Sequence, residues 1–364
     1  MINNNLIIFI PSIESGGVEK NLFLITNYLV NKFRNITIIT ASQNISKFDK
    51  KIKIIKPKKN NYFLKFRYVK IIISIFFLIT ELLKKKKITV LSFQANIYAI
   101  IVCRFFNKKI IARANSSPTG WVGSSFKVLF FRFIFSQANT IIVNSREFNK
   151  ELLDRLKIKS VCILNPLDKK IIIQKSNYKI KKPYRKKDSL KFISIGRLVD
   201  QKDHLTLLRA FKYIKNEINF ELLIIGQGKN KNLIKKYIDM NKLNKNIKIV
   251  GFKDNPYPYL KASDSLILSS RYEGLPNVIL ESLVLKKLVI SSNCPTGPKE
   301  ILSNGKGGLL FKTGSFEDLS KKILYFSKYK KKCKQKVKFS QSTLVRYDQK
   351  RNLKKYYQLI KHTI

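Results

Sequence analysis

The sequence has few of the residues that bind metal ions or form disulfide bonds. Its 364 residues include four cysteines and two histidines, and the cysteines, at positions 103, 162, 294 and 333, have no paired spacing. Neither a zinc site nor a disulfide framework is therefore indicated, and a reducing cytoplasm fits. The 14 glycines and 10 prolines are too few for a collagenous or low-complexity chain.

Long hydrophobic runs are also missing. The longest uncharged apolar stretch, Ile71–Thr80, has about half the length that a membrane-spanning helix needs. The N-terminus lacks a basic start, and Pro11 follows the apolar run Leu6–Ile10, which is unlike a signal peptide. We therefore expect a chain that does not cross a membrane and that begins with a β-strand.

Acidic residues are scarce relative to basic ones. The chain has 22 Asp and Glu against 73 Lys and Arg, a formal net charge of +51. Such a charge suggests a polyanionic partner, either nucleic acid or an anionic membrane surface. However, only 13 of the basic residues are arginines, and the abundance of Lys, Asn and Ile also fits a compositional bias. No motif of a specific nucleic-acid reader is found.

Short β-rich runs alternate with helical runs in both halves of the chain. This alternation predicts two α/β domains, Rossmann-like and doubly wound, each with a parallel sheet. Such domains in tandem leave a cleft in which ligands bind. Strands are expected at 6–10, 36–40, 88–93, 109–113, 140–144, 192–196, 221–226, 247–252, 265–270 and 288–292, and helices at 18–32, 66–83, 96–106, 125–135, 205–215, 231–240 and 278–285.

A lysine-rich stretch separates the two halves. Residues 169–188 show little apolar periodicity, which marks a linker. The predicted organisation is a first domain at 1–167, a linker at 168–190, a second domain at 191–340, and a basic C-terminal helix at 341–364 that packs back on the first domain.

The segment SSRYEGLPNVILESL (269–283) places two carboxylates around a helix start. Glu273 lies on a turn shaped by Gly274 and Pro276, and Asn277 is expected to cap the helix that contains Glu281. Eight helical residues rise about 12 Å, more than the roughly 5–9.5 Å between paired hydrolytic carboxylates. The two are expected to hold different parts of one long ligand, although a turn residue and a solvated helix residue remain the alternative.

A second segment, SIGRLVDQKDHL (194–205), places two cations after a strand. Arg197 and Lys202 follow Gly196 and are positioned to neutralise a diphosphate. Glycines also follow two other strands, at Gly16–Gly17 and Gly226–Gly228. There a ligand could approach the backbone, or glycine could serve the turn geometry alone.

In this arrangement the chain resembles the retaining glycosyltransferases of family four, which have the two-domain GT-B architecture. The resemblance covers nearly the whole chain. It rests on SGGVEKNL (15–22), GRLVDQKD (196–203), LIIGQG (223–228), VGF (250–252), SRYEGLPNVILESL (270–283), CPTGPKEIL (294–302) and NGKGGLL (304–310).

The resemblance implies a role for each matched residue. Arg197 and Lys202 would hold the diphosphate of a nucleotide-sugar donor, and Glu281 its ribose. Phe252 would lie near the base, and the loops at Gly196 and Gly226 would also contact the donor. Gly16 and Gly17 would close over its phosphates and admit the acceptor. Glu273 would orient the sugar together with the backbone N–H groups of the turn formed by Gly274, Leu275, Pro276 and Asn277, in which proline itself offers no N–H.

One departure concerns histidine. Many relatives place a histidine near the sugar from the first domain, but His204 and His362 are not at that position. The corresponding loop is ARANSSPTGW (112–121), so Arg113 and Asn115 are candidates for contact with sugar or acceptor. No Asp-x-Asp motif is present, and no metal ion or other cofactor is expected.

The implied activity is transfer of a sugar, with retention of configuration, from a nucleoside diphosphate sugar such as a UDP-sugar. The acceptor would be lipid-linked or a saccharide, as in cell-surface polysaccharide synthesis, and the chain a monomer that binds no nucleic acid. A front-face reaction without an enzyme nucleophile is expected. A sugar-nucleotide epimerase or a phosphorylase of the same fold, and a non-catalytic basic nucleic-acid-binding protein, are the alternatives.

Two segments of the first half indicate a membrane surface. Residues 64–87 carry Lys and Arg at both ends of an apolar centre, and 126–135 interleave Lys127 and Arg132 with aromatic residues. Peripheral, salt-sensitive association with the inner face of an anionic cell membrane is therefore expected. Alternatively, both helices simply pack on the sheet.

Overall fold

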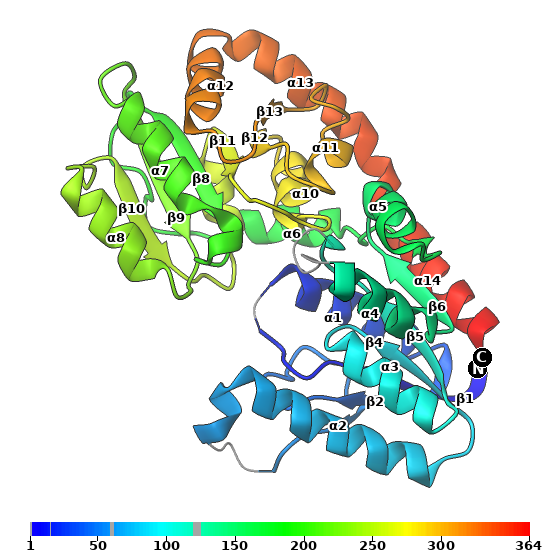
Figure 1. The fold of residues 1–364 in the computed structure, drawn as a ribbon. Coiled ribbons are helices and arrows are strands. Elements are labelled where there is room, and N and C mark those ends of the chain that lie inside the picture. The colour runs from blue at the N-terminus through cyan, green and yellow to red at the C-terminus, as the bar shows by residue number, and fades with distance from the viewer. Residues whose placement is uncertain (1, 15, 59–61, 119–124) are drawn as a thin grey trace. The chain divides into compact units, whose positions relative to one another are not determined.

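The computed structural model describes the whole chain except residues 1, 15, 59–61 and 119–124 (Figure 1). The chain forms two compact units. Unit 1 comprises residues 1–166 and 349–364, and unit 2 comprises residues 167–348. Each contains one parallel sheet covered by helices, so the predicted fold class is confirmed.

Unit 1 is built on a parallel sheet with the strand order β3-β2-β1-β4-β5-β6-β7 over the described residues. Its central strands contain the buried apolar runs Leu6–Phe9, Val90–Leu91 and Ile110–Ala112, as expected for a sheet covered on both faces. The strands are β1 (Ile2–Phe9), β2 (Phe33–Ile39), β3 (Lys53–Ile55), β4 (Ile88–Ser92), β5 (Lys109–Arg113), β6 (Thr140–Val143) and β7 (Val161–Cys162).

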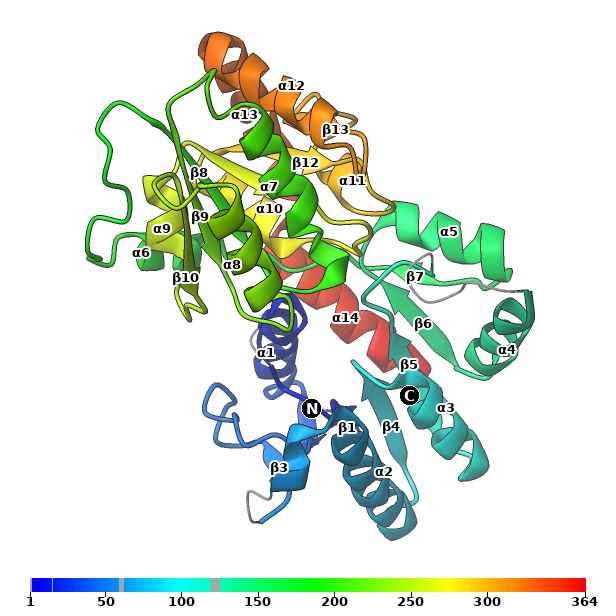
Figure 2. The same ribbon diagram turned by 60° about the vertical axis from the view of Figure 1, so that its left-hand side comes forward.

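Helices bury the two faces of this sheet in separate cores. Helices α1 (Gly17–Leu29) and α14 (Gln349–Thr363) pack on one face, where Leu22, Ile25 and Tyr356 join the strand side chains. The other face is covered by α2 (Arg67–Lys84), α3 (Asn96–Phe105), α4 (Ser125–Ser136) and α5 (Arg146–Leu156), and a short 3₁₀ turn, η1 (Tyr62–Lys65), precedes α2. Figures 1 and 2 show α2, α3 and α4 side by side.

Unit 2 repeats this design around a parallel sheet with the order β10-β9-β8-β11-β12-β13. Its strands are β8 (Leu190–Ile195), β9 (Phe220–Ile225), β10 (Ile247–Gly251), β11 (Ser265–Leu268), β12 (Leu288–Ser292) and β13 (Leu309–Phe311). Its helical elements are α6 (Lys169–Ser176), η3 (Asp200–Lys202), α7 (His204–Tyr213), α8 (Lys231–Met240), α9 (Tyr257–Ala262), α10 (Asn277–Val284), α11 (Pro298–Ile301), α12 (Phe316–Lys328), α13 (Lys330–Thr343) and η4 (Leu344–Tyr347).

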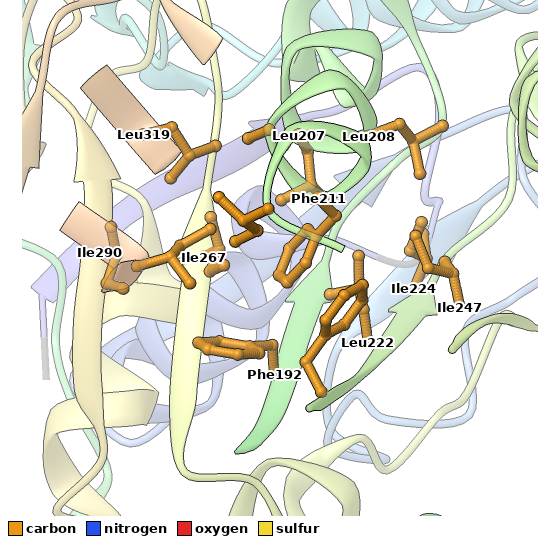
Figure 3. Packing of buried hydrophobic residues seen from close by; sticks show 14 of the residues in the cluster. Phe192, Leu207, Leu208, Phe211, Leu222, Ile224, Ile247, Ile267, Ile290 and Leu319 are labelled. Carbon is orange, nitrogen blue, oxygen red and sulfur yellow. The ribbon is translucent and has the colours of Figure 1, made fainter. Parts of the chain in front are cut away.

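One core of unit 2 lies between its sheet and α7, α8 and α12. The rings of Phe192 of β8 and Phe211 of α7 pack edge to face with their centroids 5.2 Å apart, and Figure 3 shows both side chains within this core. Both side chains are fully buried, and Ile267 and Ile290 of the next strands extend the core. This packing fixes β8 and β11 beside each other, and with them the loops that leave their ends.

The structure corrects the expected linker and tail. Residues 169–176 form α6, which Asp168 caps by accepting a hydrogen bond from the Ile171 N–H at 3.0 Å, and Ile172 is buried within unit 2. The lysines hid this helix because they occupy its solvent-facing positions. The expected helix at 341–364 is broken at η4, and α14, beginning at Gln349, is the part that packs in unit 1.

Among the described residues, every helix falls short of the length or hydrophobicity that a bilayer-spanning segment requires.

A buried arginine joins α14 to the carboxyl end of β5. The side chain of Arg113 is fully buried, and its Nε donates a hydrogen bond to Tyr356 Oη at 2.8 Å. Its Nη2 donates to Asn165 Oδ1 at 2.8 Å, its Nη1 donates to Asn115 Oδ1, and its guanidinium lies over the Phe93 ring. The chain's last helix is therefore part of the folded first unit.

We predict that Tyr356→Phe lowers the free energy of unfolding of unit 1 by about 1.5–3 kcal/mol, because it leaves a buried cationic N–H group without its acceptor. Tyr357→Phe removes a hydroxyl from the neighbouring, partly buried ring and is the matched control. Urea unfolding followed by circular dichroism measures both variants. Equal stability of the two would contradict the assigned role of the Arg113–Tyr356 contact.

Candidate functional site

The sequence-predicted donor residues of unit 2 lie at the carboxyl edge of its sheet. Strand β8 pairs with β9 on one side and with β11 on the other. All strands are parallel, but successive strands are added in one direction from β8 to β10 and in the opposite direction from β11 to β13, so the order reverses between β8 and β11. In open α/β sheets, ligands bind outside the carboxyl ends of the strands at such a switch point. The loops that follow β8 and β11 carry the predicted residues Arg197, Lys202 and Glu273.

The β8 loop turns sharply at Gly196 so that Lys202 can fold back over it. A Cβ atom at position 196 would lie 3.3 Å from Lys202 Cε, closer than side chains normally approach. The absence of a side chain at Gly196 therefore leaves room for the lysine. Arg197 is exposed at the start of the loop, with Nη2 3.5 Å from Gln201 Oε1, and its charge faces solvent.

The structure brings Lys202 and Glu273 together, although 71 residues separate them in the chain. Lys202 Nζ lies 2.5 Å from Glu273 Oε1, and their side chains are 15% and 8% exposed. An ammonium group has three N–H donors, so this contact leaves two for a ligand. The sequence pointed to both residues, but it did not reveal that they pair.

Hydrogen bonds to the backbone join the same two loops. Gln201 Nε2 donates to Tyr272 O at 2.9 Å, and Arg271 N–H donates to Gln201 O at 2.8 Å. Ser269 Oγ donates to Lys202 O at 2.8 Å. These hydrogen bonds hold the two loops next to each other, and they therefore keep Lys202 within reach of Glu273.

The loop after β12 supports Glu273 from the other side. Glu273 N–H donates to Pro295 O at 3.2 Å, and Thr296 Oγ1 donates to Glu273 O at 2.6 Å. Gly297 has φ of +87°, and a Cβ there would lie 2.1 Å from Gly274 O. Only glycine allows the two turns this close approach.

Glu281 lies in helix α10, which follows the loop after β11. The structure corrects the expected cap, because Asn277 is the first helical residue and Pro276 occupies the N-cap position without a side-chain hydrogen bond. Glu281 is 4% exposed, which is inconsistent with the alternative of a solvated helix residue. Its Oε1 accepts a hydrogen bond at 3.2 Å from the hydroxyl of Tyr257, a buried residue of α9.

The turns after β9 and β10 complete the edge. Gly226 has φ of +156°, and a Cβ there would lie 1.8 Å from Gly196 O, so close packing of the β8 and β9 loops already requires this glycine. Gly226 N–H donates to Gly251 O at 3.0 Å. Phe252 follows directly and is 37% exposed.

Two buried titratable groups near the pair are neutral at pH 7. Burial, together with the nearby Lys202 charge, lowers the pKa of His204 to about 4. Burial, followed by the charge of Glu273, raises the pKa of the Cys294 thiol to about 12. These two groups therefore add no charge to the loops that carry Arg197, Lys202 and Glu273. In the part of the chain that the structure describes, no three His, Cys, Asp or Glu side chains gather as metal ligands.

Gly16 and Gly17 lie at the start of α1 in unit 1, and Ser15 lies outside the described residues. Glu19 of the same helix turn is 7% exposed, and its Oε1 accepts a hydrogen bond from Glu14 N–H at 3.3 Å. A Cβ at Gly16 would lie 2.9 Å from Glu19 Oε2. The structure thus places the carboxylate of Glu19, which the sequence analysis did not single out within SGGVEKNL, beside Gly16.

Arg113 and Asn115 have different surroundings from those expected. Arg113 is fully buried in the network with Tyr356 and Asn165, so it does not offer its guanidinium to a sugar in this structure. Asn115 lies beside it, and its Nδ2 donates to Phe93 O at 2.6 Å. Asn115 also lines a cavity of about 400 Å³ at the carboxyl ends of β4 and β5. Residues 119–121 of the predicted loop lie outside the described residues.

Three residues of the unit 2 site were missed from the sequence. Gln201 lies in SIGRLVDQKDHL (194–205) and Thr296 in CPTGPKEIL (294–302), two segments that the sequence analysis had named. Nothing in the sequence indicated that their side chains hydrogen-bond to the loop of Glu273. Tyr257 lies in NPYPYLKASD, ahead of β11, and had no predicted role. Nothing in the sequence indicated that Tyr257 is buried or that it contacts Glu281.

The second unit is similar to known glycosyltransferases. Residues 176–343 match the family described as Glycosyl transferases group 1. An uncharacterized glycosyltransferase of Methanocaldococcus jannaschii is 38% identical over 186 residues, which cover 49% of this chain and 46% of that protein. The alignment thus spans about half the length of this relative.

A second relative and a solved structure cover more of the chain. The N-acetylgalactosamine-N,N'-diacetylbacillosaminyl-diphospho-undecaprenol 4-alpha-N-acetylgalactosaminyltransferase of Campylobacter jejuni is 28% identical over 255 residues, or 66% of this chain and 68% of that protein. The Anabaena HepE structure in complex with UDP and glucose superposes with a TM-score of 0.80, 13% identity, and coverage of 99% of this chain and 100% of that one. Residues 176–343 are therefore similar to the glycosyl transferases group 1 family, and the chain has the GT-B fold of two parallel-sheet α/β domains.

Proposed function

We propose that the chain is a retaining glycosyltransferase that moves a hexosyl group from a UDP-sugar to a saccharide or lipid-linked acceptor in cell-surface polysaccharide synthesis. The observation that carries this proposal is the contact between the loops after β8 and β11, at the switch point of the unit 2 sheet. There Arg197 and the Lys202–Glu273 pair lie within residues 176–343, which match the group 1 family. The UDP and glucose bound in the Anabaena structure favour a uridine nucleotide, and the Campylobacter relative is named for a diphospho-undecaprenol acceptor.

The charges of the site suit departure of a nucleoside diphosphate. As the bond from the anomeric carbon to the diphosphate oxygen breaks, negative charge grows on that oxygen. Arg197, the two remaining N–H groups of Lys202 and the N-terminus of α10 would interact with it more strongly than in the ground state. The acceptor hydroxyl would attack from the same face and pass its proton to the departing diphosphate, without an enzyme nucleophile or a metal ion.

Glu273 and Glu281 take separate parts in this proposal. Glu273 holds Lys202 in place at 2.5 Å and orients the sugar with the N–H groups of Gly274, Leu275 and Asn277. Glu281, with one carboxylate oxygen bonded to Tyr257, would accept hydrogen bonds from the ribose hydroxyls. Tyr257 is then a positioning residue, since it acts through Glu281.

A thermal-shift panel of nucleoside diphosphate sugars tests the donor class. A UDP-sugar at 100 times its dissociation constant should stabilise the chain by about 2.7 kcal/mol, and GDP- and ADP-sugars at equal concentration should stabilise it less. A donor incubated without acceptor should remain unchanged, whereas an epimerase would convert it. Tight RNA binding with no response to any nucleotide sugar would contradict the proposal.

Arg197→Ala should lower kcat/KM for transfer by about 100–1,000-fold, since one contact that stabilises developing charge is worth roughly 2.7–4 kcal/mol. The side chain is exposed, so the melting temperature should stay at the wild-type value. Arg209→Ala, an exposed arginine on α7 of the same unit, is the control and should retain activity. Wild-type turnover in the Arg197 variant would exclude its assignment to the diphosphate.

Glu281→Gln and Tyr257→Phe should both weaken UDP binding. Loss of a hydrogen bond to a charged group costs about 1.5–3 kcal/mol, so we expect a rise of tenfold or more in Kd by calorimetry for Glu281→Gln and a smaller rise for Tyr257→Phe. Tyr259→Phe, on the same helix, is the control. If Tyr257→Phe changes stability but leaves UDP affinity intact, Tyr257 has a purely structural role.

A further inference from the structure

Three helices of unit 1 each expose a second apolar stripe in addition to the one that packs on the sheet. On α2, the side chains of Tyr68, Ile72 and Phe76 are 62–75% exposed and recur every four residues. This is the spacing of one helix face. The complete set of exposed apolar residues, here named the α2–α4 face, is Tyr68, Ile72, Phe76 and Leu83 of α2, Tyr98, Ile101 and Phe105 of α3, and Phe126, Leu129, Phe130 and Phe133 of α4.

The opposite sides of these helices are already occupied by the core. Leu78 and Leu82 of α2, Ile100 and Cys103 of α3, and Ile134 of α4 are buried against the sheet. Helix α3 contacts both α2 and α4, and both views of the ribbon show the three side by side. The exposed stripes therefore belong to neighbouring helices and are not needed to close the core of unit 1.

Such a surface is unusual for a chain that remains alone in water. Single exposed apolar side chains are normal, but contiguous apolar patches mark interaction sites. The sequence analysis had singled out the α2 and α4 segments, and the structure adds α3, whose Phe105 is 83% exposed. Three neighbouring helices thus expose aromatic and aliphatic side chains on the side that does not pack on the sheet.

The exposed charge on α2, α3 and α4 themselves is basic. Glu81 is the only acidic residue between Asp49 and Glu147. It is 2% exposed and lies within 4 Å of the ammonium groups of Lys53, Lys84 and Lys85. Exposed basic side chains interrupt the apolar stripes, namely Lys65, Arg67, Arg104, Lys127 and Arg132. The partner must therefore be both apolar and anionic.

This combination selects among three possible partners. If a second copy of the chain bound through the same face, two α2–α4 faces with exposed basic residues would meet, and like-charge repulsion opposes this contact. An RNA would use aromatic rings for stacking, but Ile72, Leu83, Ile101 and Leu129 offer it nothing to stack on. An anionic lipid bilayer takes both kinds of group, since aromatic and aliphatic side chains insert at the interface and basic ones contact the headgroups.

We propose that the α2–α4 face docks unit 1 on an anionic lipid bilayer. This deepens the proposed function, on which it rests for the nature of the acceptor, because a docked chain meets a lipid-linked acceptor at the membrane surface. The cavity of about 400 Å³ lined by Asn115 is also lined by Tyr68 and Tyr98 of this face. A group entering from the lipid headgroups would therefore reach the carboxyl ends of β4 and β5.

The experiment is vesicle flotation of the full chain in the absence of donor and acceptor. Wild-type protein should float with vesicles that contain phosphatidylglycerol, much less with pure phosphatidylcholine vesicles, and less in 1 M salt, where the screening length is about 3 Å. The triple variant Phe76→Ser, Phe105→Ser, Phe133→Ser removes one exposed ring from each helix and should lower partitioning at least tenfold.

A matched control keeps the result specific. The triple variant Tyr213→Ser, Leu233→Ser, Met240→Ser removes three apolar side chains of unit 2 that are 49–72% exposed, and it should float like wild type. Both variants should keep the wild-type thermal shift with a UDP-sugar, so a folding defect or failure of the proposed transfer is detected separately. Equal flotation of the two variants, equal binding to neutral vesicles, or binding of RNA but not of vesicles would overturn the proposal.

Discussion

The ion pair between Lys202 and Glu273 is the contact on which the candidate site depends. It joins the loops of β8 and β11 at the point where the strand order reverses, and both partners are largely buried. Removing one partner of a buried pair leaves an uncompensated charge, which typically costs about 3–5 kcal/mol. The pair persists because Gln201, Ser269 and Thr296 fix the backbone on either side of it. Its geometry is therefore set before any ligand arrives.

Close backbone packing is the second condition for this site. Gly226 lies against the carbonyl of Gly196, and Gly297 lies against that of Gly274, at distances that no side chain would tolerate. Gly226 was considered for ligand contact, and its close approach to Gly196 gives a structural reason for glycine at this position. Glycine here allows the loops after β8 and β9, and those after β11 and β12, to pack closely at the carboxyl edge of the sheet.

The two units use their basic residues differently. In unit 1, Arg113 is buried and holds the last helix through Tyr356. By contrast, Arg67 of α2, Arg104 of α3, and Lys127 and Arg132 of α4 are exposed among apolar side chains. In unit 2, Arg197 and Lys202 lie at one edge of the sheet, where a neutral His204 adds no charge. The net charge of the chain therefore does not predict what each basic residue does, because that depends on its burial and on its nearest partners.

The sequence by itself determined the fold class and most strand positions, because runs of β-branched and aliphatic residues with helical segments between them admit one layered arrangement. Among the elements it missed are α5, α6, α12 and the strands β3, β7 and β13. In α6 the lysines are as frequent as the apolar residues, and the three strands are only two or three residues long. The sequence also identified Arg197, Lys202, Glu273 and Glu281, because charged residues directly after buried strands or in apolar helices stand out. Only the tertiary structure decided that Lys202 pairs with Glu273, that Tyr257 bonds to Glu281 and that Arg113 is buried. The reason is physical: these contacts join residues 24 to 243 positions apart, and local pattern carries no information about which loops a parallel sheet brings to the same edge.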